Sequence, residues 1–323
     1  MFGFSKLKIR GRGWASLSKA EKREARWGLG FIGLWLIGFL LFYLIPMIAS
    51  LGFSLLDFTL GAPDAVKFIG LDNWRRLLFE DATVWQSLGV TFKFALVSLP
   101  ITTAGAFFLA VLLNSEKLLA KPIFRTLFFA PSVIPFIAVI LIWTGVLNPA
   151  TGWLNGLIEW ITGLDAQSPS GIQWLDQPSL VYFALTFMAL WGIGGTMIIN
   201  LAGLQSVPTD LYDAAKIDGA NWWRRLSAVT IPMMTPVIFY NLVISLVQLL
   251  QFFVVPYVLN QGTGQPKGQT MYYMIWFYKQ TFGFQDMGYG AALAWFIFVI
   301  ALVITLVLFG SARHWVYYAG ERR

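Results

Sequence analysis

Two groups of polar residues in this apolar chain have the types and spacing needed to bind another molecule. In the first group, within residues 211–232, Asp213 is followed directly by Ala214 and Ala215. Side chains this small let the groove of another protein approach closely. Asp213, together with Asp218, can make charge-assisted hydrogen bonds to an arginine or lysine of that protein. The segment therefore predicts a docking surface for a protein partner.

The residues around this surface predict a short helix. Pro208 can begin it, because the N–H that proline lacks is not needed in the first helical turn. Gly219 can end it in a left-handed conformation, and residues 222–226 can start a second short helix. The alternative is an ordinary connection on a membrane surface, with Trp222 and Trp223 as interfacial anchors and the two following arginines against phospholipid headgroups.

The second group is a polar stripe on a predicted helix. Asn241, Ser245 and Gln248 follow i, i+4, i+7 spacing and share one face, which Phe252 continues with Gln251 alongside. Uncharged amides and hydroxyls can bind sugar hydroxyls, and an aromatic ring can cover the apolar C–H side of a pyranose. Hydrogen bonding between helices is the alternative role of such residues in membranes. Further substrate candidates are Trp143, Thr196 and, least favoured, Lys93.

The elements that position these groups are predicted to be membrane helices. The chain has 323 residues, 57% hydrophobic and 12% charged, against about 25% charged in an average globular domain. Five windows contain no Asp, Glu, Lys or Arg, a sixth contains only Lys93, and each exceeds the ~20 residues that span a bilayer. We expect an all-α polytopic protein with six transmembrane helices near residues 29–51, 88–113, 124–147, 180–203, 233–259 and 289–311.

Lysines and arginines are distributed unequally between the two sides of these helices. The two terminal segments, the second-to-third connection and the fourth-to-fifth connection hold 17 of the 23, and the opposite loops hold five. The positive-inside rule therefore places both termini in the cytoplasm. The expected organisation is a basic cytoplasmic segment over residues 1–28, a membrane domain over 29–311 and a cytoplasmic tail over 312–323.

Several kinds of catalytic site are excluded by composition. The absence of cysteine excludes thiolate metal sites and cysteine nucleophiles, and the sole histidine, His314, lies in the basic tail. No Gly-x-x-x-x-Gly-Lys-Ser/Thr loop is present to hold a nucleotide phosphate. We therefore expect no metal site, no cofactor in this chain and no enzymatic activity.

The segment 211–232 resembles the signature loop of the permease subunits of binding-protein-dependent ABC importers. That pattern reads Glu-Ala-Ala, three residues, Gly, nine residues, Ile-x-Leu-Pro. It corresponds here to Asp213-Ala214-Ala215, Gly219 and Val229-x-Ile231-Pro232, with Asp for Glu, Val for Ile and Ile for Leu. The resemblance extends over about residues 69–308, through the motifs at 125–143, 202–208 and 284–292. The chain is most similar to carbohydrate permeases akin to the first membrane subunit of the maltose and glycerol-phosphate importers, although residues 260–266 depart from their usual Thr-x-Gly-Gly-Pro.

The resemblance implies a type I ABC importer permease in a bacterial or archaeal cytoplasmic membrane. Its implied partners are a second homologous permease, two ATP-binding cassette subunits that bind ATP and Mg, and an extracytoplasmic sugar-binding protein. Residues 206–232 would then be the coupling loop. Its ATPase interface would comprise Asp213, Ala214, Ala215, Asp218, Gly219 and Pro232, and it would receive the work of ATP hydrolysis in the other subunits.

The main rival is an ion- or proton-coupled secondary transporter of a small polar solute. Such proteins need ionisable groups within the membrane to bind the driving ion. Here the apolar runs contain only Lys93 and no acid, which argues against this class.

Overall fold

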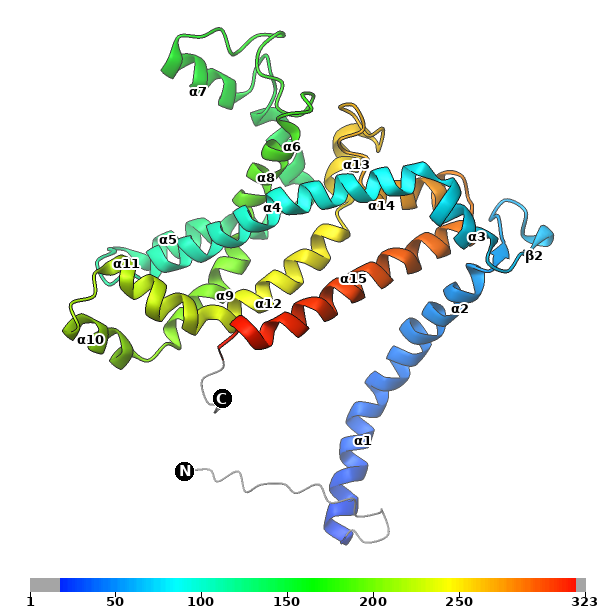
Figure 1. Cartoon of the computed structure of the whole chain (residues 1–323), viewed down its shortest axis with the longest axis horizontal. Coiled ribbons are helices and arrows are strands. Elements are labelled where there is room, and N and C mark those ends of the chain that lie inside the picture. The colour runs from blue at the N-terminus through cyan, green and yellow to red at the C-terminus, as the bar shows by residue number, and fades with distance from the viewer. Residues whose placement is uncertain (1–17, 318–323) are drawn as a thin grey trace.

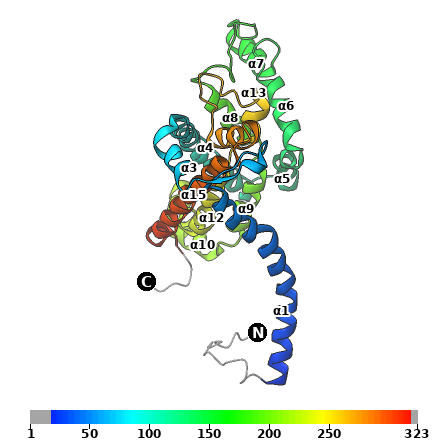
Figure 2. The same cartoon turned by 90° about the vertical axis from the view of Figure 1, so that its right-hand side faces the viewer.

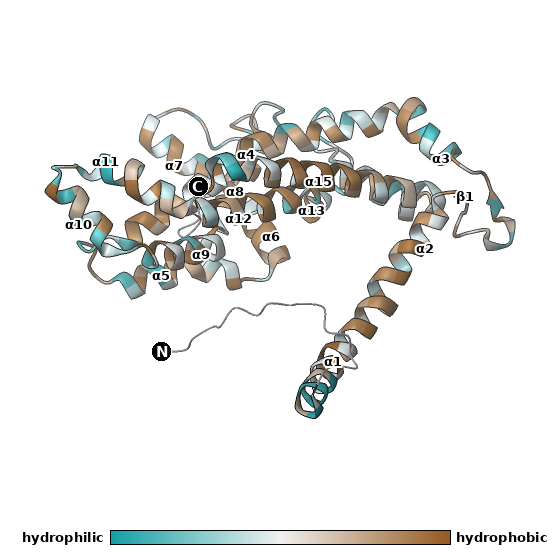
Figure 3. Ribbon diagram, turned by 60° about the horizontal axis from the view of Figure 1, so that its bottom comes forward, coloured by the Kyte–Doolittle hydropathy of each residue, from teal (hydrophilic) through white to brown (hydrophobic). Residues whose placement is uncertain are grey.

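The computed structural model describes residues 18–317, which form mainly helices around a central bundle (Figures 1 and 2). Residues 1–17 and 318–323, the outer parts of the expected cytoplasmic segments, lie outside the described residues. Within the described part, four helices are long and apolar enough to cross a membrane, or up to six if each of two bent helix pairs is one span. Figure 3 shows hydrophobic residues along α2, α6, α12 and α15, and hydrophilic residues at the start of α1 and near α10 and α11.

The first span extends away from the bundle in both views (Figures 1 and 2). It comprises α1 (Lys19–Phe39), a π-helical turn η2 (Leu40–Leu44) and α2 (Ile45–Phe53), and none of its residues is buried. It begins ten residues before the predicted 29–51 because Ser18 and Glu21 form a reciprocal capping box. One hydrogen bond of 3.1 Å, from the Trp295 indole to the Ser50 hydroxyl, ties its far end to the bundle.

Three long helices form the centre of the bundle: α4 (Ala82–Asn114), α12 (Ile231–Leu250) and α15 (Met287–Trp315). Asp81 caps α4 by accepting from the Thr83 amide, so this helix starts six residues before the predicted 88–113. The helix predicted over 233–259 is interrupted at residues 251–253 and resumes as α13 (Val254–Asn260). Before α12 lie α11 (Trp222–Arg225) and a π-helical segment η6 (Leu226–Thr230).

The continuous helices predicted over 124–147 and 180–203 are each two helices. The first is α5 (Lys121–Phe129), η5 (Ala130–Val133) and α6 (Phe136–Val146), bent by 101°, and prolines at 131 and 135 interrupt its hydrogen bonds. The second is α8 (Val181–Trp191) and α9 (Gly194–Gln205), bent by 58°. Gly194 lies so close to α5 that a Cβ there would overlap the Phe128 carbonyl oxygen.

Short elements cover one end of the bundle. A hairpin pairs β1 (Leu56–Asp57) with β2 (Lys67–Phe68) in antiparallel register, Leu56 opposite Phe68, around η3 (Pro63–Ala65). Near it lie α3 (Asp72–Arg75), η4 (Arg76–Glu80), α14 (Tyr273–Tyr278) and η7 (Lys279–Gly283). A separate lobe carries α7 (Trp153–Thr162), at the top of Figure 1, and α10 (Thr209–Ile217) lies at its lower left.

Asp81 holds this end together. One carboxylate oxygen accepts hydrogen bonds from the Trp276 indole at 2.9 Å and from the Tyr289 hydroxyl at 2.7 Å. Arg76 forms an ion pair of 2.8 Å with Asp286 and lies 3.9 Å from the centre of the Tyr289 ring. These contacts fix the starts of α4 and α15 to α14.

Candidate functional site: an exposed docking helix and a polar cavity

The exposed helix α10 follows the local rules expected of its sequence. Pro208 precedes its first turn, and Gly219 follows its end with a φ of +74°. The Ala220 amide then donates to the Ala215 carbonyl oxygen at 2.9 Å, and Asn221 caps α11 by accepting from the Arg224 amide. The predicted proline start, glycine end and second short helix are therefore confirmed.

The predicted docking residues divide between an exposed surface and the bundle. Asp213, Ala214, Asp218 and Gly219 are exposed, and Ala215 is half-buried. The Asp213 carboxylate accepts from Lys216 at 2.9 Å within the helix, so a partner's cation would have to share or replace that pair. Pro232 is separate from this surface, because it lies in the first turn of α12.

Tyr212 connects α10 to the bundle, a role that the sequence reasoning missed. Its ring packs against the buried cluster that contains Leu204, Val207 and Met234. Its hydroxyl shares a hydrogen bond of 3.1 Å with the buried Thr230 hydroxyl, which also donates to the Arg225 carbonyl oxygen at 3.4 Å. The other α10 side chains except Ala215 are exposed. The sequence did offer a sign of this role, because Tyr212 is an aromatic residue among small and charged neighbours.

A polar cavity of about 360 Å³ lies between α4, α9 and the far end of α12. It is lined by four of the five predicted substrate residues, Ser245, Gln248, Gln251 and Phe252, and by the further candidate Thr196. Ser98 and Thr102 of α4 add two hydroxyl residues that the sequence reasoning missed, although their i, i+4 spacing would have been a signal. No charged side chain is among the lining residues, so the cavity is suited to an uncharged polar group.

Asn241 is a correction to the predicted stripe. Its side chain is buried and its amide nitrogen donates to the Asn200 side-chain oxygen at 3.0 Å, across to α9. Because α9 covers this part of α12, Asn241 does not line the cavity, and the interhelical alternative describes this residue. The candidate Trp143 is likewise packed against Phe187 and Trp191, and Lys93 is exposed on α4.

Replacing Asn241 with alanine is expected to lower the free energy of unfolding by about 0.6–1.7 kcal/mol, the range for hydrogen bonds between membrane helices. The substitution removes the partner of the buried Asn200 side chain. Thermal unfolding in detergent measures the change. A double leucine variant at both positions should recover most of the loss, since no polar group is then left unpaired. Unchanged stability with impaired substrate uptake would contradict the structural role.

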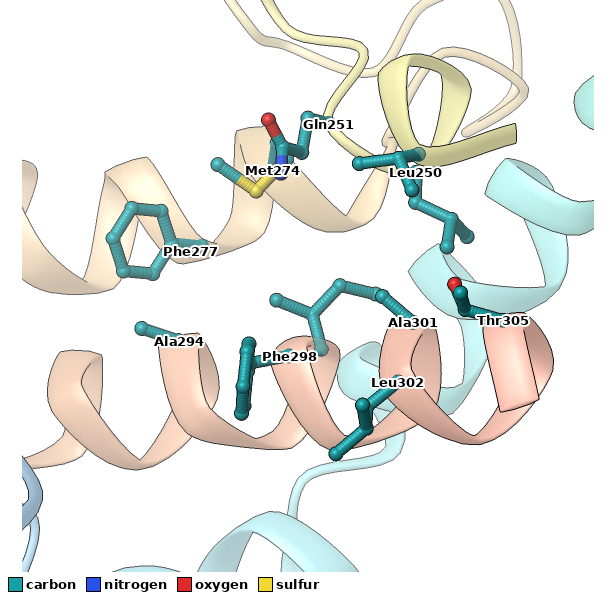
Figure 4. Close-up of a pocket in the computed structure, with 11 residues that line it drawn as sticks. Leu250, Gln251, Met274, Phe277, Ala294, Phe298, Ala301, Leu302 and Thr305 are labelled. Atoms are coloured by element: carbon teal, nitrogen blue, oxygen red, sulfur yellow. The ribbon is translucent and has the colours of Figure 1, made fainter. Parts of the chain in front are cut away.

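A second, mainly apolar cavity of about 430 Å³ lies between α12, α14 and α15. Figure 4 shows Met274 and Phe277 facing Ala294 and Phe298 across it. Gln251 lines both cavities, so the break after α12 places one amide between a polar and an apolar space. At the start of α14, burial raises the pKa of Tyr273, whose hydroxyl donates to the Leu293 carbonyl oxygen of α15 at 2.8 Å.

The part of the chain that the structure describes contains no cluster of three or more His, Cys, Asp or Glu side chains placed to hold a metal ion. The described arrangement combines the exposed helix α10 with uncharged polar groups within the bundle.

Comparisons with known proteins agree with this arrangement. Residues 103–322 match the family described as binding-protein-dependent transport system inner membrane component. A probable ABC transporter permease protein, YesP of Bacillus subtilis, is 36% identical over 305 residues, covering 94% of this chain and 96% of that protein. The lactose transport system permease protein LacF of Rhizobium radiobacter is 32% identical, covering 84% of this chain and 89% of that protein.

Solved structures show the same fold. A bacterial ABC transporter involved in the import of the acidic polysaccharide alginate has a chain with a TM-score of 0.71 and 24% identity, covering 92% of this chain and 99% of that one. The same score is found for a bacterial alginate ABC transporter in complex with an alginate pentasaccharide-bound periplasmic protein. The chain therefore has the type I ABC importer permease fold, and it belongs to the family of inner-membrane permease components of binding-protein-dependent ABC importers.

Proposed function

We propose that this permease forms half of the translocation pathway of a sugar importer. The observation that carries the proposal is the polar cavity, where Ser245, Gln248 and Thr196 offer uncharged hydrogen-bonding groups beside the Phe252 ring. Such groups suit a sugar, which presents hydroxyls on its edge and C–H groups on its faces. Relatives named for lactose, trehalose/maltose and arabinooligosaccharide transport, 29–32% identical to this chain, support the sugar class.

The proposed arrangement has six membrane spans, with each bent pair counted as one, and cytoplasmic ends. Two observations support it: the excess of lysine and arginine in one set of segments, and the position of α10 at the end of the bundle where α15 ends (Figures 1 and 2). The expected division into segments 1–28, 29–311 and 312–323 follows from it. Partners would be a second permease, two ATP-binding subunits on the α10 side and a sugar-binding protein outside.

In this proposal, α10 receives the movement that ATP produces in the partner subunits. Asp213, Ala214, Ala215, Asp218 and Gly219 would form the surface that docks. Tyr212 would pass the movement to Thr230, at the end of η6, and so to α12, which carries Ser245 and Gln248. The bundle would then open alternately inward and outward around the polar cavity. ATP and Mg would bind only to the partner subunits.

Replacing the exposed Ala214 with tryptophan tests the docking surface. A bulky ring there is expected to block close approach, so an affinity-tagged variant should recover severalfold less ATP-binding subunit from mild-detergent extracts than the parent chain. Ser170→Trp, at an exposed position on the α7 lobe, is the matched control and should recover normal amounts. Normal recovery with Ala214→Trp would contradict docking at α10, and failure of the parent chain to bring down any P-loop ATPase would contradict the importer.

A further inference from the structure

The helix α7 exposes an apolar face. Trp153, Leu157, Trp160 and Ile161 lie within one arc of this helix, and the two tryptophans are 82% and 83% exposed. Large exposed apolar patches mark surfaces that contact a partner or a membrane. The orientation is the reverse of that of a helix in a water-soluble lobe, whose apolar side would face inward.

The opposite face of α7 is fixed to the lobe, so the apolar face cannot rotate inward. Asn155 is fully buried, donates to the carbonyl oxygens of Pro149 and Ile172, and accepts from the Trp174 indole at 2.7 Å. The Glu159 carboxylate accepts a hydrogen bond from the backbone N–H of Gln167 at 2.9 Å. These two polar side chains of α7 therefore make their hydrogen bonds within the lobe, and the exposed apolar arc is available to contact another molecule.

Charge and position indicate what covers this arc. Residues 148–179 contain no lysine or arginine, and their three acids are Glu159, Asp165 and Asp176. Only six residues separate α7 from the apolar helix α6, and Figures 1 and 2 both show α7 at the far end of α6. A lobe attached so closely to membrane helices, without cations and with two tryptophans on one face, fits the outer surface of a bilayer.

We propose that α7 lies on the outer surface of the membrane, with Trp153, Leu157, Trp160 and Ile161 buried among lipid headgroups and upper acyl chains. The inference rests on the proposed topology, in which residues 148–179 are extracytoplasmic. A lipid surface fits better than the binding protein, because a partner that leaves in every cycle would return this apolar face to water. Interfaces of such transient partners are on average no more apolar than the rest of a protein surface. Tryptophan is enriched at the membrane–water interface, where its ring is buried and its N–H stays hydrated.

The absence of cysteine from this chain allows a direct test in the transporter assembled with cysteine-free variants of its partner subunits. Single-cysteine variants Trp153→Cys and Leu157→Cys are spin-labelled in phosphatidylcholine–phosphatidylethanolamine vesicles, and collisions with oxygen and with a water-soluble nickel complex are compared. Leu157→Cys keeps both tryptophans, so a result there does not depend on losing an anchor. Thr162→Cys, exposed on the opposite side of the same helix, is the matched control.

Labels at 153 and 157 are expected to collide severalfold more with oxygen, and severalfold less with nickel, than the label at 162. Nickel access equal to that at 162 would overturn the proposal, as would protection that appears only when the sugar-binding protein is added. Shielding from both reagents would show a protein contact, such as the second permease, and would also overturn it. If any of these results accompanies normal sugar uptake and ATP hydrolysis, the importer assignment stands and only the membrane contact of α7 fails.

Discussion

Replacing Tyr212 with alanine is expected to lower the sugar transported per ATP hydrolysed by roughly 5- to 60-fold. Truncating a buried aromatic ring costs about 3–5 kcal/mol, and every 1.4 kcal/mol is a factor of ten in an equilibrium. Tyr212 is only half-buried, so about a third to a half of that energy is a reasonable expectation for the contact that links α10 to Thr230. ATP hydrolysis should continue, because the exposed residues proposed to dock the ATP-binding subunits are unchanged. Reconstituted vesicles give both rates, and their ratio measures the coupling.

Two conservative variants separate the ring from the hydrogen bond. Tyr212→Phe keeps the packing against Met234 but loses the hydroxyl, and Thr230→Val removes the acceptor. Each should lower the ratio by about fivefold, the effect of one hydrogen bond worth ~1 kcal/mol, and the double variant should be no worse than either single one. A normal ratio in Tyr212→Ala, or an equal loss of ATP hydrolysis and transport, would contradict the coupling role.

Removing both the Ser245 hydroxyl and the Gln248 amide, as Ser245→Ala with Gln248→Ala, is expected to raise the sugar concentration for half-maximal transport. Two hydrogen bonds of ~1–1.5 kcal/mol each correspond to roughly a 30- to 150-fold change. The measurement uses vesicles that contain a complex able to transport sugar without the binding protein, so that selection by that protein does not mask the effect. Unfolding temperature should hardly change, because neither side chain has a described hydrogen bond to lose within the chain.

Ile244→Ala provides the control for this double variant. Ile244 is exposed on the same helix and does not line the polar cavity, so its truncation should leave the transport concentration unchanged. Equal transport by the double variant and the parent would remove these two residues from the sugar pathway. A fall in complex assembly without a change in the concentration dependence would assign them to helix packing instead.

The helix α10 was largely predictable because its boundaries depend on local chemistry. A proline start, a glycine that adopts a positive φ and an asparagine cap act within a few residues of one another, so residues 208–224 indicate α10 and α11 directly. The placement of Ser245 and Gln248 on one side of α12 was also predictable, since one helical period brings them together, whereas Gln251 and Phe252 line the same cavity from the break after α12.

The features that were missed depend on contacts between distant segments. Periodicity places Asn241 in the same stripe as Ser245, but only the position of α9 decides that Asn200 covers it. The prolines indicate that the helix over 124–147 is weakened, but they do not give its 101° bend or the close approach of α5 to α9 at Gly194, which involves residues more than 60 positions apart. The sequence around Asp81 gives no sign of its role, because its partners Trp276 and Tyr289 lie 195 and 208 residues later.

That separation along the chain has a consequence for biosynthesis. At about 5–20 residues per second, the ribosome needs roughly 10–40 s to reach Tyr289 after it has made Asp81. For most of that interval α4 is already synthesised, while the Asp81 oxygen has neither donor until Trp276 and then Tyr289 are made. The start of α4 therefore gains these two hydrogen bonds only after α14 and the first turn of α15 have been made, so a chain that stops before residue 276 leaves the Asp81 carboxylate without either donor.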